Sequence, residues 1–90
     1  MNLVVIGINH KTAPVELREL LNFSKEDCVR FLEELKELPQ VEEAMVLSTF
    51  NRVELCAVAS AGSESELLHA LARFHGLEPE SLQSHLYLLR

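Results

Sequence analysis

The chain has 90 residues, of which 48% are apolar and 24% charged, and 14 acidic against 8 basic residues give a formal net charge of −6. This size and balance suit one small globular domain, and the acidic charge argues against a nucleic-acid-binding module that acts alone. No apolar run approaches the ~20 residues of a membrane span, no basic stretch of a signal peptide opens the chain, and two cysteines are too few for a disulfide scaffold, so we expect a cytoplasmic protein without a membrane partner.

The first part of the chain predicts a strand followed by helices. Residues 3–8 form a short, β-branched apolar run that is typical of a buried strand. Pro14 suits the first turn of a short helix, in which Leu17, Leu20 and Leu21 face one side. A longer helix is expected between the N-cap Ser24 and Pro39, with an apolar stripe of Cys28, Phe31, Leu32, Leu35 and Leu38.

A hairpin is predicted in the middle of the chain. Residues 41–48 and 53–59 each favour a strand, and only Thr49-Phe50-Asn51-Arg52 separates them. The alternation of the second strand places one set of side chains on the same face, namely Val53, Leu55, Ala57 and Ala59. Arg52, Glu54 and Cys56 are expected on the opposite face.

The last part of the chain predicts a helix and a strand. Ser63 with Glu66 has the pattern of a capping box, and Gly76 suits the C-cap of the helix between them. The expected apolar stripe is Leu67, Leu68, Leu71 and Phe74. Residues 79–84 favour one more turn, and residues 86–89 favour a fourth strand.

The resulting order, β-α-β-β-α-β, predicts an α+β, ferredoxin-like sandwich in which two helices cover one face of a four-stranded antiparallel sheet. In this arrangement the first strand is central. The loop after it, residues 7–14, is therefore expected to converge with the hairpin at residues 49–52. Arg90 follows the last predicted strand directly, which suggests a cut through a longer protein, and a natural end at this residue is the alternative.

The hairpin carries the best candidate for a binding site. Arg52 can hold a carboxylate through its planar guanidinium, and small hydrogen-bonding side chains lie beside it at Ser48, Thr49 and Asn51. The alternative is a solvated ion pair between Arg52 and Glu54, which share a face of the strand.

The cysteines and the remaining histidines are weaker candidates. Cys28 lies on an apolar helical stripe, and Cys56 has no local histidine or lysine that would lower its pKa. The other histidines lack metal-ligand spacing with either cysteine, so we expect no metal site and structural or solvated roles for His69, His75 and His85.

Two motifs resemble the start of glutamyl-tRNA reductases. They are Gly7-Ile8-Asn9-His10-Lys11-Thr12-Ala13-Pro14-Val15 and Leu47-Ser48-Thr49-x-Asn51-Arg52-Val53-Glu54-Leu55, and the resemblance extends over all 90 residues. It implies that residues 1–90 form the N-terminal subdomain of the catalytic domain. The rest of the catalytic domain with its histidine, an NADPH-binding domain and a helical domain that forms a homodimer would then lie outside this chain.

The resemblance also implies a reaction. The family reduces glutamyl-tRNA with NADPH to glutamate-1-semialdehyde, the first committed step of one route to porphyrins, haem and other tetrapyrroles. A cysteine thiolate attacks the glutamyl ester and displaces the tRNA, and the resulting thioester accepts a hydride. No metal takes part.

The sequence departs from the family at one position. Phe50 stands where the family has its nucleophilic cysteine, and a phenyl ring has no nucleophilic atom, so we expect this chain to be inactive. Cys56, six residues further along, is too far down the strand to replace it. By the resemblance, Thr49, Asn51 and Arg52 belong to the glutamyl-recognition segment, with Arg52 the partner of a substrate carboxylate and His10 and Lys11 in supporting roles.

Three functional hypotheses follow. The chain is part of a reductase in which Phe50 is a variant or an unusual natural residue, or a reductase-like module that binds a glutamyl group without turnover, or a domain for protein interaction. An RNA-recognition motif shares the topology but needs aromatic residues on its central strands, which this sequence lacks.

Overall fold

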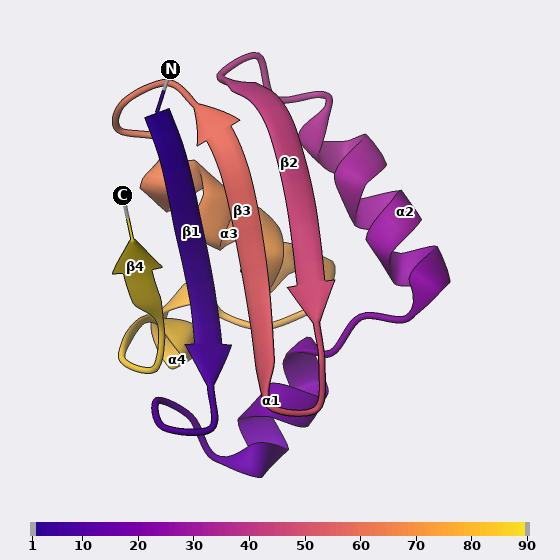
Figure 1. Cartoon of the computed structure of the whole chain (residues 1–90), viewed down its shortest axis with the longest axis vertical. Coiled ribbons are helices and arrows are strands. Elements are labelled where there is room, and N and C mark those ends of the chain that lie inside the picture. The colour runs from indigo at the N-terminus through magenta and orange to yellow at the C-terminus, as the bar shows by residue number, and fades with distance from the viewer. Residues whose placement is uncertain (1, 90) are drawn as a thin grey trace.

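The computed structural model describes residues 2–89. Its single sheet is antiparallel, has the strand order β2-β3-β1-β4, and consists of β1 (Asn2–Asn9), β2 (Val41–Ser48), β3 (Arg52–Ala59) and β4 (Tyr87–Leu89). The helices are α1 (Val15–Leu21), α2 (Lys25–Leu35), α3 (Glu64–Phe74) and α4 (Pro79–Gln83). Figure 1 shows α3 behind the sheet, α2 alongside β2, and α1 at the end of the sheet where the β2–β3 hairpin turns. The predicted ferredoxin-like α+β fold is confirmed, and the two short helices α1 and α4 occupy the segments expected to form a short helix and a turn.

The core lies between the sheet and the helices. Every second residue of β3 is buried, and β1 contributes Val4, Ile6 and Ile8 to the same layer. From the helices come Leu21, Phe31, Leu35, Leu67, Leu71 and Leu82, which are at most 2% exposed. Burying one such side chain contributes about 1.5–3 kcal/mol to the free energy of folding, so the burial of this layer is the main favourable contribution to the stability of the domain. Three aromatic rings, those of Phe23, Phe31 and Phe74, pack together with centroid distances of 5.2–5.6 Å.

Local hydrogen bonds set the helix ends. The Ser24 hydroxyl accepts a hydrogen bond from the Asp27 N–H at 3.1 Å, and the Asp27 carboxylate accepts one from the Ser24 N–H at 3.5 Å, so α2 begins with a capping box. Gly76 has a φ of +69° and follows the C-cap residue His75 of α3, and the Leu77 and Gly76 N–H groups donate to the last carbonyls of the helix, as expected for a glycine at this place.

The capping box predicted at Ser63 is wrong. The Ser63 hydroxyl donates to the Ser60 carbonyl at 2.7 Å, and Ser63 itself has φ −86° and ψ 0°. An N-cap side chain needs an extended backbone to reach the N–H groups of the first turn. The helical backbone of Ser63 turns its hydroxyl back to the preceding loop instead, so the Ser-x-x-Glu pattern is present without the capping geometry.

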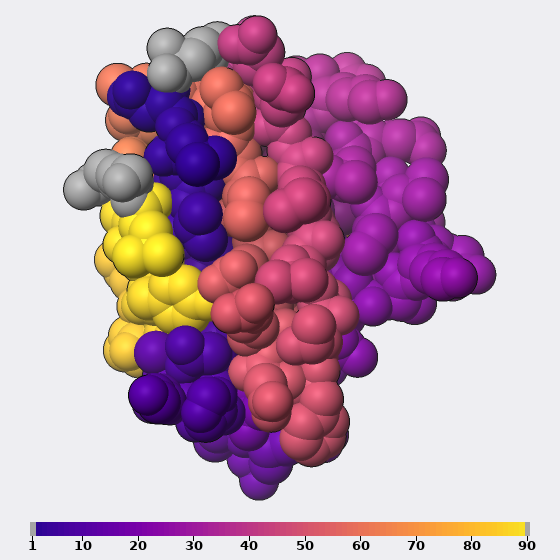
Figure 2. All heavy atoms as spheres, viewed as in Figure 1, coloured from indigo at the N-terminus to yellow at the C-terminus, as the bar shows by residue number. Residues whose placement is uncertain are grey.

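No helix formed by residues 2–89 covers the face of the sheet opposite α3. Figure 2 shows side chains of all four strands at the surface on this side. Leu3, Met45 and Leu89 are each more than half exposed. The alternation of β3 places Arg52, Glu54 and Cys56 on this outer face, as predicted, because their neighbours Val53 and Leu55 point into the core.

Candidate functional site

The two segments expected to converge do so at one end of the outer face. Asn9, the last residue of β1, lies opposite Arg52, the first residue of β3. Together with His10, Thr49 and Asn51 they line an open depression of about 340 Å³. We call these five residues the Asn9–Arg52 corner. The antiparallel pairing of β1 with β3 therefore brings together residues more than 40 positions apart in sequence.

The loop after β1 is held by the side chain of Asn9. Its Oδ1 accepts hydrogen bonds from the N–H groups of Lys11 at 2.9 Å and Thr12 at 3.1 Å, and the Thr12 hydroxyl accepts one from the Asn9 N–H at 3.0 Å. The His85 Nδ1 lies 3.2 Å from the Thr12 carbonyl oxygen and ties this loop to the segment before β4. The Asn9 side chain is thus committed to the loop, while the His10 and Lys11 side chains are exposed.

The hairpin is closed by Thr49. Its backbone N–H donates to the Arg52 carbonyl at 2.8 Å, and its hydroxyl accepts a hydrogen bond from the Arg52 N–H at 3.2 Å. Phe50 and Asn51 form the two-residue tip, and neither has a positive φ. A two-residue hairpin of type I′ needs positive φ at both tip residues. Here the Thr49 hydroxyl takes the place of a backbone acceptor and helps to close the turn.

Ser48, expected beside Arg52 as a hydrogen-bonding group, is used elsewhere. Its hydroxyl donates to the Asn22 Oδ1 at 2.6 Å and accepts from the Phe23 N–H at 3.1 Å. These bonds join the end of β2 to the linker between α1 and α2. Within the corner, the side chains of His10, Asn51 and Arg52 have no hydrogen-bond partner among the described residues, whereas those of Asn9 and Thr49 bond within their own turns.

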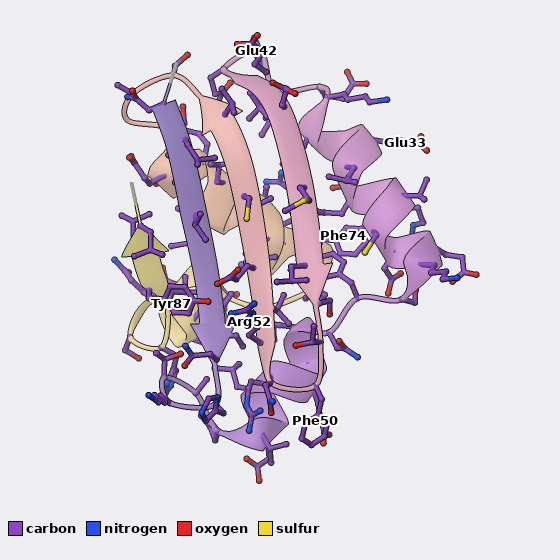
Figure 3. All side chains as sticks on the ribbon, viewed as in Figure 1. Glu33, Glu42, Phe50, Arg52, Phe74 and Tyr87 are labelled. Atoms are coloured by element: carbon purple, nitrogen blue, oxygen red, sulfur yellow. The ribbon has the colours of Figure 1, made fainter. Side chains whose placement is uncertain are left out.

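Phe50 lies at the tip of the hairpin and is 83% exposed. Figure 3 shows it at the end of the molecule, beyond Arg52. Its carbonyl oxygen accepts a hydrogen bond from Arg18 Nη1 of α1 at 3.1 Å, which fixes the backbone at position 50. A side chain at this position therefore projects from a constrained backbone, and Phe50 lies against α1 beside Val15 and Arg18 and not among the residues that line the corner.

The expected alternative, an ion pair of Arg52 with Glu54, does not form. Among the described residues no carboxylate lies within ion-pair distance of the Arg52 guanidinium. The Glu54 carboxylate instead accepts a hydrogen bond from the Tyr87 hydroxyl of β4. Burial and the neighbouring Glu54 raise the pKa of Tyr87, and the positive charge of Arg52 acts in the opposite direction. Sequence reasoning missed this contact because it depends on the pairing of β1 with both β3 and β4.

The cysteines stay outside the corner. Cys56 lies opposite Val5 on one side and Met45 on the other, four residues from Arg52, which is about 13 Å along a strand. Burial, and then the charge of Glu54, raise the pKa of the Cys56 thiol, which disfavours the nucleophilic thiolate. Cys28 packs against the core as expected. Residues 2–89 contain no group of three or more side chains that could hold a metal ion, and none of their helices is long and apolar enough to span a membrane.

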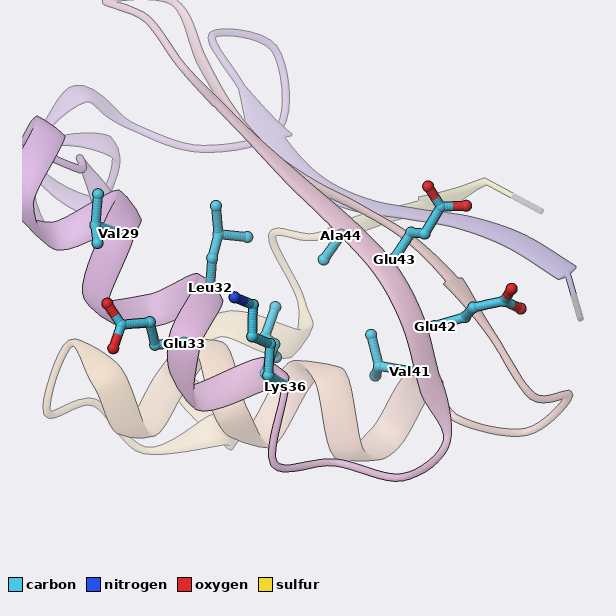
Figure 4. A pocket seen from close by; sticks show the side chains of 9 residues that line it. Val29, Leu32, Glu33, Lys36, Val41, Glu42, Glu43 and Ala44 are labelled. Carbon is cyan, nitrogen blue, oxygen red and sulfur yellow. The ribbon is translucent and has the colours of Figure 1, made fainter.

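A second depression, of about 490 Å³, lies between α2 and β2. Figure 4 shows its walls: apolar side chains such as Val29, Leu32 and Val41, with Glu33, Lys36, Glu42 and Glu43 around them. None of these side chains was expected to form a site. The groove presents carboxylates and one ammonium but no convergent hydrogen-bonding set, so the corner is the better candidate.

Known proteins with similar sequences identify the family. The family model of the glutamyl-tRNAGlu reductase N-terminal domain matches residues 6–90. The chain belongs to this family. A glutamyl-tRNA reductase from Chromohalobacter salexigens is 49% identical over 87 residues, which cover 97% of this chain and 20% of the relative. Another, from Syntrophotalea carbinolica, is 47% identical over 90 residues, which cover 98% of this chain and 20% of the relative.

A solved structure of a family member has the same architecture. The glutamyl-tRNA reductase from Methanopyrus kandleri superposes with a TM-score of 0.68 and 26% sequence identity, over 98% of this chain and 18% of that chain. The chain thus spans about a fifth of the length of these glutamyl-tRNA reductases. The resemblance seen in the two sequence motifs is confirmed as a family relationship.

Proposed function

We propose that residues 1–90 form the N-terminal subdomain of the catalytic domain of a glutamyl-tRNA reductase, and that the Asn9–Arg52 corner recognises the glutamyl group of the substrate. The observation that carries this proposal is the unpaired guanidinium of Arg52 beside an open depression, in a chain of this family. Arg52 would bind the side-chain carboxylate of the glutamyl group through its two parallel N–H donors. Asn51 and His10 would add hydrogen bonds from either side.

Position 50 would then carry the nucleophile of the family's reaction. A cysteine on the constrained backbone between Thr49 and Asn51 would lie two residues before the carboxylate-binding Arg52 in the same hairpin. Its sulfur would attack the ester carbonyl, a carbon–sulfur bond would form and the bond to the tRNA oxygen would break. Phe50 cannot take this step. We therefore propose that this chain binds a glutamyl group without acyl transfer, and that it is inactive as it stands.

The remaining steps belong to other parts of a longer protein. The family's reduction uses NADPH as the hydride donor. The glycines of this chain, at positions 7, 62 and 76, do not form the Gly-x-Gly-x-x-Gly pattern that cradles a dinucleotide. We assign no cofactor contact to these residues. Glutamyl-tRNA as the partner, a homodimer through a further domain, and a cytoplasmic role in making tetrapyrroles are proposed for the whole protein.

The test restores the missing nucleophile. The chain with Phe50→Cys is mixed with the α-(4-nitrophenyl) ester of glutamate, and the protein is followed by mass spectrometry. We expect one glutamyl thioester per chain at position 50, with release of one nitrophenolate. The parent chain is the matched control because it keeps Cys28 and Cys56.

A second control separates recognition from reactivity. The corresponding ester of alanine has no side-chain carboxylate and should label the Phe50→Cys chain much more slowly. Equal labelling by both esters would contradict glutamyl recognition by the corner. Equal labelling of the parent and the variant would place the reactive thiol at Cys28 or Cys56 instead.

A further inference from the structure

Glu54 and Tyr87 meet above a residue that has no side chain. Gly7 of β1 lies opposite Glu54 of β3 on one side and opposite Tyr87 of β4 on the other. A Cβ at Gly7 would come within 2.8 Å of the Glu54 Cγ and 3.0 Å of the Tyr87 Cζ. The two side chains therefore bridge β3 and β4 across the backbone of β1, and the bridge needs glycine at this position.

This bridge determines where the Glu54 carboxylate lies. Arg52 and Glu54 are two residues apart on the same face of β3, about 7 Å along the strand, and their long side chains can reach each other over that distance. Yet the carboxylate is bonded to the Tyr87 hydroxyl, and the guanidinium has no carboxylate within ion-pair distance among the described residues. Figure 3 shows Tyr87 and Arg52 on the same, outer face of the sheet.

We propose that Tyr87 is a positioning residue for Arg52: by holding the Glu54 carboxylate over Gly7, its hydroxyl keeps the Arg52 guanidinium free for the carboxylate of the glutamyl group. The inference rests on the proposed function of the corner. A released Glu54 would pair with Arg52 and compete with the ligand. An exposed ion pair of this kind weakens binding of a competing carboxylate by about two- to fivefold.

The test uses the 90-residue chain and glutamic acid α-methyl ester, which keeps the free side-chain carboxylate and carries an ester where the substrate does. Its Kd is measured by NMR titration for the parent, Tyr87→Phe, Glu54→Gln and the double variant. Tyr87→Phe removes only the hydroxyl, and we expect its Kd to rise about two- to fivefold. The double variant should return to the parent Kd, because an amide at position 54 cannot neutralise Arg52.

Two results would overturn the inference. If the double variant binds as weakly as Tyr87→Phe, the hydroxyl acts through the structure of the sheet and not by restraining a charge. If Glu54→Gln alone weakens binding, Glu54 contacts the ligand itself.

A crystal structure of the Tyr87→Phe chain separates this inference from the proposed function. We expect the Glu54 carboxylate within 4 Å of the Arg52 guanidinium in that variant. If the Glu54 carboxylate instead remains next to β4 in the variant, Tyr87 is not a positioning residue for Arg52. A parent chain that does not bind the ester contradicts the proposed function, and the place of Glu54 in the variant still decides the role of Tyr87.

Discussion

Asn9 ends β1 directly opposite Arg52, which begins β3. The pairing gives each of the two residues a different task. The Asn9 side chain accepts hydrogen bonds within the turn after β1. Arg52 is bonded to the hairpin through its backbone, and its guanidinium has no hydrogen-bond partner among the described residues. A hydrogen-bonded turn beside a guanidinium that has no carboxylate partner among the described residues suits a site that must hold a small anionic group in one orientation.

Replacing the exposed ring at the hairpin tip should hardly affect stability. Phe50 is 83% exposed and gains little from burial, so Phe50→Cys is expected to change the free energy of unfolding by no more than about 0.5 kcal/mol. Urea unfolding of parent and variant measures this directly. Phe31→Ala, at a fully buried ring, should cost about 3–5 kcal/mol and serves as the contrast. A loss above about 3 kcal/mol for Phe50→Cys would mean that the ring is part of the core.

The shape of the cation at position 52 should matter as well as its charge. Arg52→Lys keeps the positive charge but loses the planar pair of N–H donors, so the Kd for glutamic acid α-methyl ester should rise about five- to tenfold. Arg73→Lys, on the exposed face of α3, is the matched control and should leave the Kd unchanged. Equal affinity of the Arg52→Lys and parent chains would remove Arg52 from the site.

Gly7 should tolerate no side chain. An added Cβ would lie 2.8 Å from the Val53 carbonyl oxygen, and backbone cannot move aside as a flexible side chain can. We expect Gly7→Ala to destabilise the fold by about 1–3 kcal/mol in urea unfolding. Gly62→Ala is the comparison, because a Cβ there meets nothing within 4 Å and only its φ of +84° opposes the change. A smaller loss at Gly7 than at Gly62 would argue against the close approach of the three strands.

Stability should fall as the solution becomes mildly acidic, because of His75. Burial lowers the pKa of His75 below 6.5, and the charge of Asp27 opposes this only in part. The ring packs edge-on against Phe23 and Phe74, and its buried Nε2 has no hydrogen-bond partner in the described structure. Below pH ~6.5 the unfolded chain therefore takes up a proton that the folded chain does not, which lowers the free energy of unfolding until the folded-state pKa is passed.

The check compares urea unfolding at pH 7.5 and pH 5.5 for the parent, His75→Phe and His10→Gln. The loss of stability between the two pH values should be smaller in His75→Phe than in the parent. His10 is exposed, so His10→Gln should behave as the parent. An unchanged loss in His75→Phe would assign the pH dependence to other groups.

Much of the fold could be predicted because its signals are local. The apolar alternation of β3, the Ser24 cap of α2 and the glycine after α3 each act over a few residues, and the structure confirms them. The convergence of residues 7–14 with the hairpin could also be predicted from the sequence, because it depends only on the order of the strands in the sheet. The prediction of a cap at Ser63 is wrong because the backbone angles of Ser63 are not those of an N-cap residue. The preceding loop sets these angles, and the pattern of side chains does not reveal them.

The candidate site was predicted less completely. The residues of the hairpin were found, but the pattern did not show that Ser48 bonds to the α1–α2 linker or that Arg18 holds the Phe50 carbonyl. The bond between Glu54 and Tyr87 was also missed, although Gly7 within an apolar strand was a signal of close approach. All of these contacts join segments far apart in the chain, where spacing along the sequence carries no information.

The central claim is that the Asn9–Arg52 corner binds a glutamyl group. NMR titration of the parent chain with glutamic acid α-methyl ester tests it most directly. We predict that the amide signals of Asn9, His10, Asn51 and Arg52 shift together with one Kd, and that Arg52→Gln abolishes the shifts. No shift, or shifts confined to the groove between α2 and β2 and unchanged by Arg52→Gln, would contradict the claim.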